Sequence, residues 1–405
     1  MTPFDLERRS LEWMLDTEAV RASAEQVFSW VLRDGSRHFA LDLTALDAVA
    51  RRVAKLTLAT YGDVASIPYH ARDRHFSAGG VDRLAVLNQI LDPLPPLERL
   101  RTRIDLVVTS VLLDAGAGAD WRFNEPDSGQ TFTRSEGLAV ASWYWFVGGG
   151  FSNDPRRAPL RADAQALQRV DAAALRRAFQ VSKDNPLVGL EGRAALLARL
   201  GRTVAAGGRF FPGGRPGSLA DYLLAQARDG RLPASTLASA VIQGFAPVWP
   251  GREQLEGKNL GDVWRHSELG LIAFHKLSQW LAYSLVEPLE EAGVQVWGLD
   301  HLTGLPEYRN GGLFVDAGVI LPKHDAVLAR AHRPDSDLII EWRALTVALL
   351  DRTAQALRKL WQLEAGALPL AKVLEGGTWA AGRQLAQEKR RGAPPITIES
   401  DGTVF

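Results

Sequence analysis

Cysteine is absent from this chain of 405 residues, which excludes disulfides, thiolate catalysis and metal sites built on cysteine. An excess of one charge is also absent, because 47 Lys and Arg balance 47 Asp and Glu. A neutral chain has no overall field that would attract nucleic acid or an anionic membrane. No stretch approaches the roughly 18 apolar residues of a membrane helix, and the start, MTPFDLERRS, carries Asp and Glu where a signal peptide needs basic residues followed by an apolar run. We expect a soluble, unprocessed cytoplasmic protein.

Metal-ligand spacing is missing as well. The eight histidines include no H-x-x-x-H pair of the kind that binds zinc from one face of a helix. We therefore expect neither a metal site nor a bound cofactor.

Apolar residues make up 46% of the chain, with 12 tryptophans, which is enough for a large core. Apolar residues at helical spacing predict helices at 20–31, 167–178, 271–285 and 339–349. Alternation typical of a strand is clearest at the end, where Ile396 and Ile398 precede a turn at Asp401-Gly402. The sequence predicts a mainly α protein with a minor β element near the C-terminus. Its Pro and Gly clusters are too short for linkers, so we expect one unit, 1–405, of two closely packed helical lobes.

Two glycine-rich stretches resemble helix starts. In FFPGGRPGS, Arg215 and an N-cap at Ser218 suggest a phosphate or carboxylate site, because a helix N-terminus offers free N–H groups and a positive dipole end. In LEGGTWAAGR, Thr378 is the expected N-cap. The alternative for both is an ordinary capped helix that binds nothing.

Other segments allow a binding role or a purely structural one. His275 and Lys276 interrupt the apolar stripe at 271–285, and a lysine there is paired, functional or extended outward to solvent. The aromatic run at 136–155 is either a stacking platform or core. Small residues around Asp120 and Trp121 would let a ligand approach the backbone closely.

The stretch GLDHLTGLPEYRNGGLFVDAGVI, 298–320, places Glu307, Tyr308 and Arg309 in succession between apolar residues. That apolar bracket predicts a turn packed against the protein rather than left in solvent. The bracket consists of Leu302, Leu305, Leu313 and Phe314.

Segments along nearly the whole chain resemble one family, the fourth protein of the Urc/Urg pathway of uracil catabolism, formerly a domain of unknown function. The resemblance implies a role in a pathway that converts uracil to its ribonucleotide, opens the ring, and releases urea and a three-carbon acid. The matching segments are HFSAGG, DAGAGADWRF, GRPGSLADYL, GLDHLTGLPEYRNGGLFVDAGV, LEGGTWAAGR and PPITIESDGTVF.

The order of VRASAEQVF, GGGFSNDP, AFHKLSQW, LDHLTGLPEYR and IIEWRALTVALL is more distantly similar to the queuosine-nucleotide N-glycosylases. This resemblance implies a helical, glycosylase-like architecture of the helix-hairpin-helix type. It also implies a turn carboxylate at Glu307, where that family has aspartate. The other implied site residues are Tyr308, Arg309, Lys276, Glu341 and Arg343.

Together the two resemblances imply hydrolysis of the N-glycosidic bond of a ring-opened uracil ribonucleotide or of ribosylurea phosphate. Glu307 would stabilise an oxocarbenium-like transition state from a hairpin tied by Arg309 or Arg343, and Lys276 would bind phosphate or hydroxyls. The leaving nitrogen would be protonated by Asp401 or Asp316, although Asp316 has a rival role as the cap of a helix starting at Ala317.

Two other classes of function stay open. One is an amidohydrolase that cuts the acyl-urea bond, and the other is a non-catalytic protein that binds the intermediate. The expected partner is a small ribosyl or nucleotide-derived molecule, with neither nucleic acid nor membrane, and a homodimer is left open.

Overall fold

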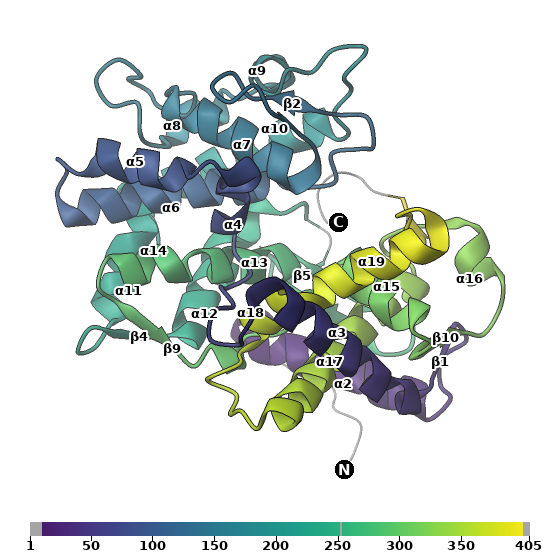
Figure 1. Ribbon diagram of the computed structural model, residues 1–405. Coiled ribbons are helices and arrows are strands. Elements are labelled where there is room, and N and C mark those ends of the chain that lie inside the picture. Colours follow the sequence, from purple (N-terminus) through teal and green to yellow (C-terminus); the bar gives the residue numbers. More distant parts are fainter. Residues whose placement is uncertain (1–9, 252, 400–405) are drawn as a thin grey trace. The chain divides into compact units, whose positions relative to one another are not determined.

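Helices dominate the computed structural model, which describes residues 10–251 and 253–399 (Figure 1). The chain forms two compact units. The described part of unit 1 comprises residues 10–70, 253–279 and 298–399. The described part of unit 2 comprises residues 71–251 and 280–297, so helix α13 (Lys276–Ser284) begins in one unit and ends in the other.

Helix α17 (Asp337–Trp361) is the core helix of unit 1. Its first half is buried on all sides, from Leu338 to Leu350, as expected for a helix that other helices surround. Helices α2 (Thr17–Leu32), α3 (Leu46–Tyr61) and α15 (Tyr308–Asp316) pack against it. The shorter helical segments of this unit are α1 (Leu11–Met14), η2 (Leu43–Ala45), η6 (Leu299–His301), α16 (Ala326–Ala329) and α18 (Leu370–Val373).

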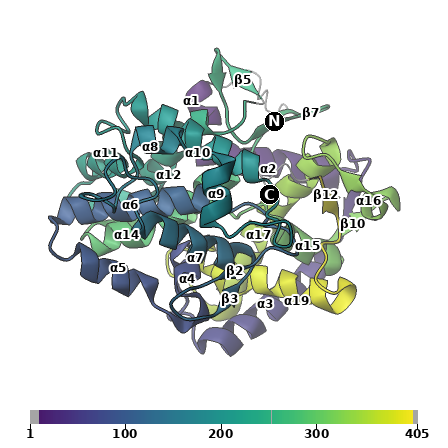
Figure 2. The same cartoon turned by 90° about the horizontal axis from the view of Figure 1, so that it is seen from above.

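A continuous helical segment follows α18. One turn of π-helix, η7 (Leu374–Thr378), leads directly into α19 (Trp379–Arg390), which lies beside α3 in both views of the ribbon (Figures 1 and 2). The expected helix start at Thr378 is therefore wrong, since Thr378 has helical dihedral angles and makes no cap hydrogen bond. The glycines before it serve close packing instead: a Cβ on Gly377 would lie 2.8 Å from side-chain atoms of Thr57 and Val53 on α3.

Strands are short and scattered. Within the described residues they form six two-stranded ladders, and β11–β12 and β4–β9 are parallel. The pair near the C-terminus joins Ala331 to Thr397, but the turn expected at 401–402 lies outside the described residues. In unit 1 the strands are β1 (Phe39–Leu41), β5 (Gln254–Leu255), β6 (Lys258–Asn259), β7 (Val263–His266), β8 (Gly270–Ala273), β10 (Ile320–Pro322), β11 (Ala331–His332) and β12 (Thr397–Ile398).

Unit 2 is built around α6 (Pro96–Leu112), which is buried from Thr102 to its end and packs against α7 (Arg134–Val147). Trp143 and Phe146 of α7 and the following Phe151 are core residues, which supports a structural role for the aromatic run. The other helical segments are α4 (Asp73–Phe76), η3 (Ala78–Gly80), α5 (Arg83–Leu91), α8 (Ala164–Gln168), α9 (Ala172–Ala178), α10 (Leu190–Ala205), η4 (Pro216–Ser218), α11 (Leu219–Gln226), α12 (Ala234–Phe245), η5 (Ala246–Val248) and α14 (Val286–Glu291). Its strands are β2 (Phe123–Asn124), β3 (Thr131–Phe132), β4 (Arg231–Pro233) and β9 (Gln295–Trp297).

Two of the four predicted helices are confirmed and two need correction. The stripes at 20–31 and 339–349 lie in α2 and α17. The stripe at 167–178 is divided between α8 and α9, because the side chain of Asp171 caps a new helix by accepting from the N–H of Ala174. The stripe at 271–285 begins as strand β8, and its helix starts only at Lys276.

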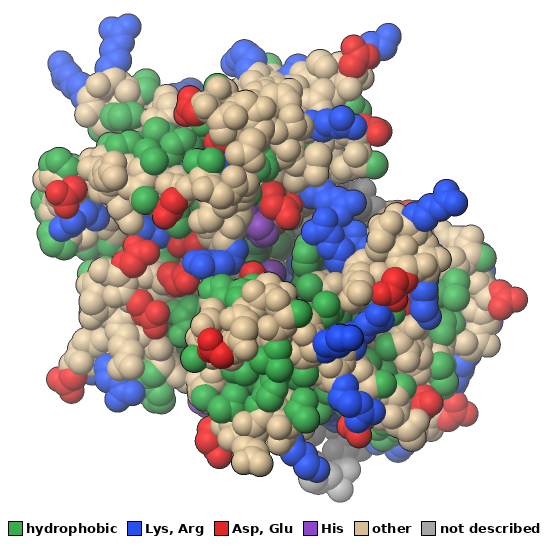
Figure 3. Space-filling model, in the orientation of Figure 1, with side chains coloured by type: hydrophobic (Ala, Val, Ile, Leu, Met, Phe, Trp, Pro, Cys, Tyr) green, Lys and Arg blue, Asp and Glu red, His purple; other side chains and the backbone are tan. Residues whose placement is uncertain are grey.

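Basic and acidic side chains both occur across the face of the molecule drawn in Figure 3, in line with the balanced composition. Among the described residues, no helix combines the length and the apolar character that a bilayer-spanning segment requires.

Candidate functional site

Glu307 lies at the N-cap of α15 in unit 1. One carboxylate oxygen accepts from the backbone N–H of Arg309 at 2.8 Å, and the other accepts from the N–H of Asn310 at 2.5 Å. A carboxylate at this position satisfies two N–H groups of the first turn and interacts favourably with the helix dipole. The side chain is thus held in one orientation by the backbone of its own helix.

The expected environment of Glu307 is confirmed in part. Leu302, Leu305, Leu313 and Phe314 are buried, so the segment is packed down as predicted. It is not a tight hairpin between two helices, however, because Tyr308 and Arg309 form the first turn of α15, and residues 302–306, between η6 and Glu307, are not helical.

Burial raises the pKa of the Glu307 carboxyl above its ordinary value. The two backbone hydrogen bonds oppose this rise, and so do the positive charges of Lys276 and His70. An ionised carboxylate has about four acceptor positions, of which the cap uses two. Glu307 can therefore face a developing cation or accept from a water molecule without giving up its role in the helix.

Lys276 is the first residue of α13, and Asp262 fixes this start. The backbone N–H of Lys276 donates to the Asp262 carboxylate at 3.0 Å, and the indole N–H of Trp264 donates to it at 2.6 Å. Arg343 of α17 adds two bonds, of 3.0 and 2.8 Å. Burial alone would raise the pKa of Asp262, but Arg343 and these donors hold it well below its usual range. Asp262 thus joins α13 to α17 as a permanent carboxylate.

A second polar cluster in unit 1 joins three segments. Nδ1 of His70 lies 2.7 Å from Oε2 of Glu375, and the hydroxyl of Tyr61 donates to Oε1 of Glu375 at 3.2 Å. Tyr61 ends α3, and Glu375 lies in the π-helical turn η7. Turns of π-helix occur often at functional sites. The turn η7 continues into α19, which packs against α15, the helix that Glu307 caps, and the charge of His70 lowers the pKa of the Glu307 carboxyl.

Arg309 and Arg343 do not have the expected task of tying a hairpin around Glu307. The guanidinium of Arg309 donates to the carbonyl of Gly392 at 2.9 Å and lies over the ring of Tyr308. Arg343 is buried and paired with Asp262. Both side chains serve the packing of unit 1.

Glu341 and His275 are buried and form hydrogen bonds within the protein. Glu341 is buried, accepts from the hydroxyl of Ser36, and lies 3.3 Å from Nε2 of His266. His275 is buried in a left-handed conformation (φ 46°), and its Nε2 lies 2.7 Å from the carbonyl oxygen of Met14. Burial lowers the pKa of His275, which favours the neutral form of the ring.

Of the two expected acids, Asp316 lies within the described residues. Asp316 ends α15 and does not cap a helix at Ala317, because a turn and strand β10 follow. Its carboxylate is buried and accepts from Arg390 at 2.5 Å, which commits it to an ion pair. Asp401 lies outside the described residues.

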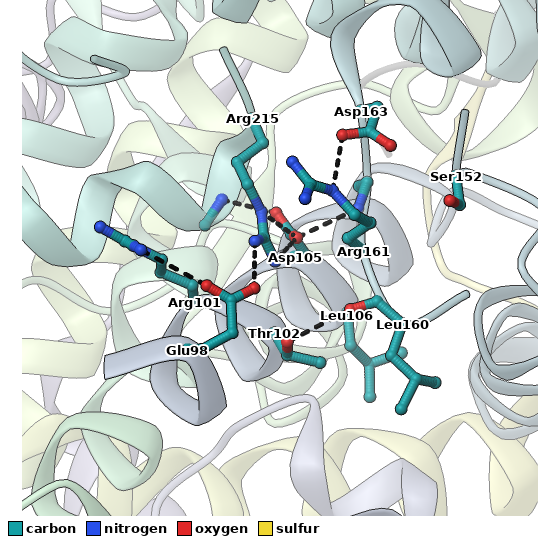
Figure 4. A network of polar contacts seen from close by, with 12 residues as sticks. Glu98, Arg101, Thr102, Asp105, Leu106, Ser152, Leu160, Arg161, Asp163 and Arg215 are labelled. Atoms are coloured by element: carbon teal, nitrogen blue, oxygen red, sulfur yellow. Dashed lines mark hydrogen bonds and ion pairs between the residues drawn. The ribbon is translucent and has the colours of Figure 1, made fainter. Parts of the chain in front are cut away.

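At the expected phosphate site, Arg215 is paired with carboxylates of the protein itself (Figure 4). Arg215 is buried and pairs with Asp105 and Glu98, both from α6. Asp105 also accepts from the backbone N–H of Gly217 at 2.6 Å. Ser218 makes no cap hydrogen bond. The glycine-rich turn therefore binds the carboxylate of Asp105, and the proposed role in phosphate binding is not supported.

The segment around Trp121 is likewise a packing element. Trp121 is fully buried, and its indole N–H donates to the carbonyl of Phe179 at 2.9 Å. Asp120 beside it is exposed. Both residues belong to unit 2, as do Arg215 and Ser218, whereas Glu307 and Lys276 belong to unit 1.

His70, Glu375, Tyr61 and Asp262 are the polar residues of unit 1 that sequence reasoning missed. Glu375 directly precedes the glycine pair of LEGGTW, so the glycines were a usable signal of close helix packing next to a carboxylate. Nothing in the spacing along the chain indicates the other three, because Glu375 is 314 residues from Tyr61 and 305 from His70, and Arg343 is 81 residues from Asp262. Among the described residues, no group of three or more His, Asp or Glu side chains is arranged to hold a metal ion.

Comparison with known proteins agrees with the resemblance seen in the sequence. The model of the family described as "Protein of unknown function (DUF1688)" matches residues 13–405. Protein urg3 of Schizosaccharomyces pombe (strain 972 / ATCC 24843) is 38% identical over 406 residues, which covers 97% of this chain and 98% of that protein. Uracil catabolism protein 4 of Lachancea kluyveri is 37% identical over 429 residues, with 96% and 97% covered.

Proposed function

Because the chain belongs to the DUF1688 family, we propose that it acts in uracil catabolism, as the name of its Lachancea kluyveri relative indicates for that protein. The proposed reaction is hydrolysis of the N-glycosidic bond of a ring-opened uracil ribonucleotide or of ribosylurea phosphate. The products are a ribose phosphate and either a ureido acid or urea. No metal takes part in the proposed reaction.

The observation that carries this proposal is the geometry of Glu307. Cleavage of an N-glycosidic bond passes through an oxocarbenium-like transition state, which a fixed carboxylate stabilises. The N–H groups of Arg309 and Asn310 hold the Glu307 carboxylate in place before substrate arrives. A preorganised group of this kind needs no reorientation as positive charge develops at the anomeric carbon.

Lys276 supplies the complementary charge in this proposal. Its ammonium group lowers the pKa of Glu307, and its backbone is anchored by Asp262 at the start of α13. A lysine fixed in this way can bind a phosphate or the ribose hydroxyls as a point charge. We also propose a glycosylase-like architecture, with which the mainly helical fold is compatible.

Turnover of purified substrates tests the proposal. The chain is incubated with ribosylurea, with ribosylurea 5-phosphate and with the ring-opened uracil ribonucleotide, and urea, ureido acid, sugar and ammonia are quantified. We expect urea and the sugar in equal amounts. For the ring-opened nucleotide, cleavage of the acyl-urea bond with an intact ribosyl bond would indicate an amidohydrolase. Tight binding without any product would indicate a carrier of the intermediate, and either result would overturn the proposed hydrolysis.

A further inference from the structure

The cluster of Tyr61, His70 and Glu375 is built like a proton-transfer group. Glu375 accepts from Tyr61 through one oxygen and contacts Nδ1 of His70 through the other. A carboxylate on Nδ1 fixes both the ring orientation and the tautomer of a histidine. The backbone N–H of His70 also donates to the carbonyl of Ala371 at 3.0 Å, so the residue is held at both its backbone and its ring.

His70 differs from the two buried histidines of unit 1. His275 and His266 are about 1% exposed, and both use a ring nitrogen to hold backbone, at Met14 or at the N–H groups that follow His266. The side chains of His70 and Glu375 are 15% and 20% exposed. A carboxylate–imidazole pair at the edge of the core is suited to proton exchange rather than to packing.

The π-helical turn explains why Glu375 stands where it does. Thr57 of α3 donates to the carbonyl of Gly376 at 2.9 Å, and the glycines allow α3 and η7 to approach closely. This approach brings the end of α3, with Tyr61, to the carboxylate of Glu375. The local irregularity of the helix therefore assembles the cluster.

We propose that His70 is the general acid that protonates the departing nitrogen, with Glu375 and Tyr61 as its positioning residues. This inference rests on the proposed function. It gives His70 the role of protonating the leaving nitrogen, which the ion pair of Asp316 with Arg390 makes unsuitable for Asp316. Glu375 and Glu307 are connected through the packing of α19, the continuation of η7, against α15, and the charge of His70 also lowers the pKa of the Glu307 carboxyl.

The step balances as follows. The bond between the anomeric carbon and nitrogen breaks, and its electron pair passes to the nitrogen, which takes the proton from Nε2 of His70. Water forms the new carbon–oxygen bond beside Glu307 and releases a proton, which restores His70. The net change is the addition of one water. Urea is a poor leaving group as an anion, so the reaction needs such an acid.

Substrates with different leaving groups test this assignment. Ribosylurea 5-phosphate needs protonation of its leaving group, whereas a 4-nitrophenyl β-ribofuranoside 5-phosphate releases a stable anion. For His70→Gln we expect kcat on ribosylurea phosphate to fall by roughly 10² or more, the scale of general acid catalysis. On the nitrophenyl substrate we expect a change of less than about threefold, because no proton has to be delivered.

Glu375→Gln should shift the ratio of the two rates in the same direction by a smaller factor, since it disturbs only the orientation of His70. The exposed His301 provides a matched control, and His301→Gln should leave both rates unchanged. The ratio of the two rates on one preparation does not depend on how much of a variant is folded, so partial misfolding does not obscure the result.

Three outcomes would overturn the inference. Equal loss on both substrates would mean a structural role for His70, and unchanged rates would mean no role. If wild-type protein hydrolyses neither substrate, the proposed function fails and this inference fails with it. In the first two cases the wild type still hydrolyses its substrate, so the proposed function stands and only the role of His70 is removed.

Discussion

The carboxylate of Glu307 lies 2.5 Å from the backbone nitrogen of Asn310 and caps helix α15. The proposed catalytic group is therefore also a structural one, and a simple charge-removing substitution would confuse the two roles. Glu307→Gln removes the charge but leaves a side chain that is not among the preferred N-cap residues, so it weakens the cap. Glu307→Asn removes the charge while placing one of the best N-cap residues at this position.

Helix α15, which Glu307 caps, packs closely against α19. A Cβ on Gly382 would lie 2.0 Å from the carbonyl oxygen of Arg309, which is backbone and cannot move aside easily. We expect Gly382→Ala to lower stability by about 1–3 kcal/mol or more through overpacking, although alanine favours helix. Gly366→Ala, where nothing lies within 4 Å, should be neutral or slightly stabilising. Thermal unfolding of both variants measures the difference, and equal melting temperatures would contradict it.

Arg215 has a structural role in unit 2. Burial raises the pKa of Asp105 even with Arg215 beside it, so the carboxylate depends on its partner. We expect Arg215→Ala to lower stability by about 3–5 kcal/mol, the cost of leaving a buried charge unpaired. Arg99→Ala on α6, the helix of Asp105, removes an exposed pair with Asp92 and should cost about 0–1 kcal/mol.

Denaturant unfolding of the two variants measures these costs. An Arg215→Ala protein with wild-type stability that loses affinity only for phosphorylated substrates would restore the phosphate-binding role.

The ion pair of Asp262 and Arg343 predicts a dependence of stability on pH. The pKa of Asp262 is lower in the folded protein than in the unfolded chain, so its stabilising effect is complete above the unfolded pKa, about 3.9, and is lost as pH falls toward the folded pKa. The difference in unfolding free energy between wild type and Asp262→Asn should be large at pH 7 and shrink below about pH 4. A difference that stays constant over this range would contradict the assignment.

The carboxyl of Glu307 gives a pH dependence of stability opposite to that of Asp262. Its pKa is raised in the folded protein, so the neutral form is favoured there, and its contribution to stability is present below the unfolded pKa and lost as pH rises through the folded pKa. Catalysis needs the ionised form. We therefore expect kcat to fall on the acid side at a pH above the ordinary range of a glutamate. A profile with no fall until the ordinary range would argue against Glu307 as the essential carboxylate.

Apolar periodicity was sufficient to predict a helix where the apolar stripe is long. The stripes in α2 and α17 were found correctly because their apolar residues continue for several turns. The helix expected at 271–285 was wrong at its start, because Leu271 fits a strand as well as a helix and pairs with Arg265 in the β7–β8 ladder. Short apolar runs do not distinguish the two.

The sequence indicates the candidate site only at residues that lie in a motif shared with a resembling family. Glu307 and Lys276 lie in such motifs, and both stay candidates.

The glycine pair at Gly376-Gly377 resembles a helix start, because a π-helical turn and a glycine-rich cap look alike in one sequence. His70 and Glu375 are 305 residues apart, so only the fold reveals that they form a pair.

The most direct test of the proposed hydrolysis measures the melting temperature and the single-turnover rate on ribosylurea 5-phosphate for one preparation each of wild type, Glu307→Asn and Glu307→Asp. We expect both variants to keep a melting temperature close to that of the wild type, because asparagine and aspartate preserve the cap. The rate of Glu307→Asn should fall by roughly 10² or more, as for loss of a preorganised charge, while Glu307→Asp keeps more of the activity. A stable Glu307→Asn protein that releases urea at the wild-type rate would contradict the account.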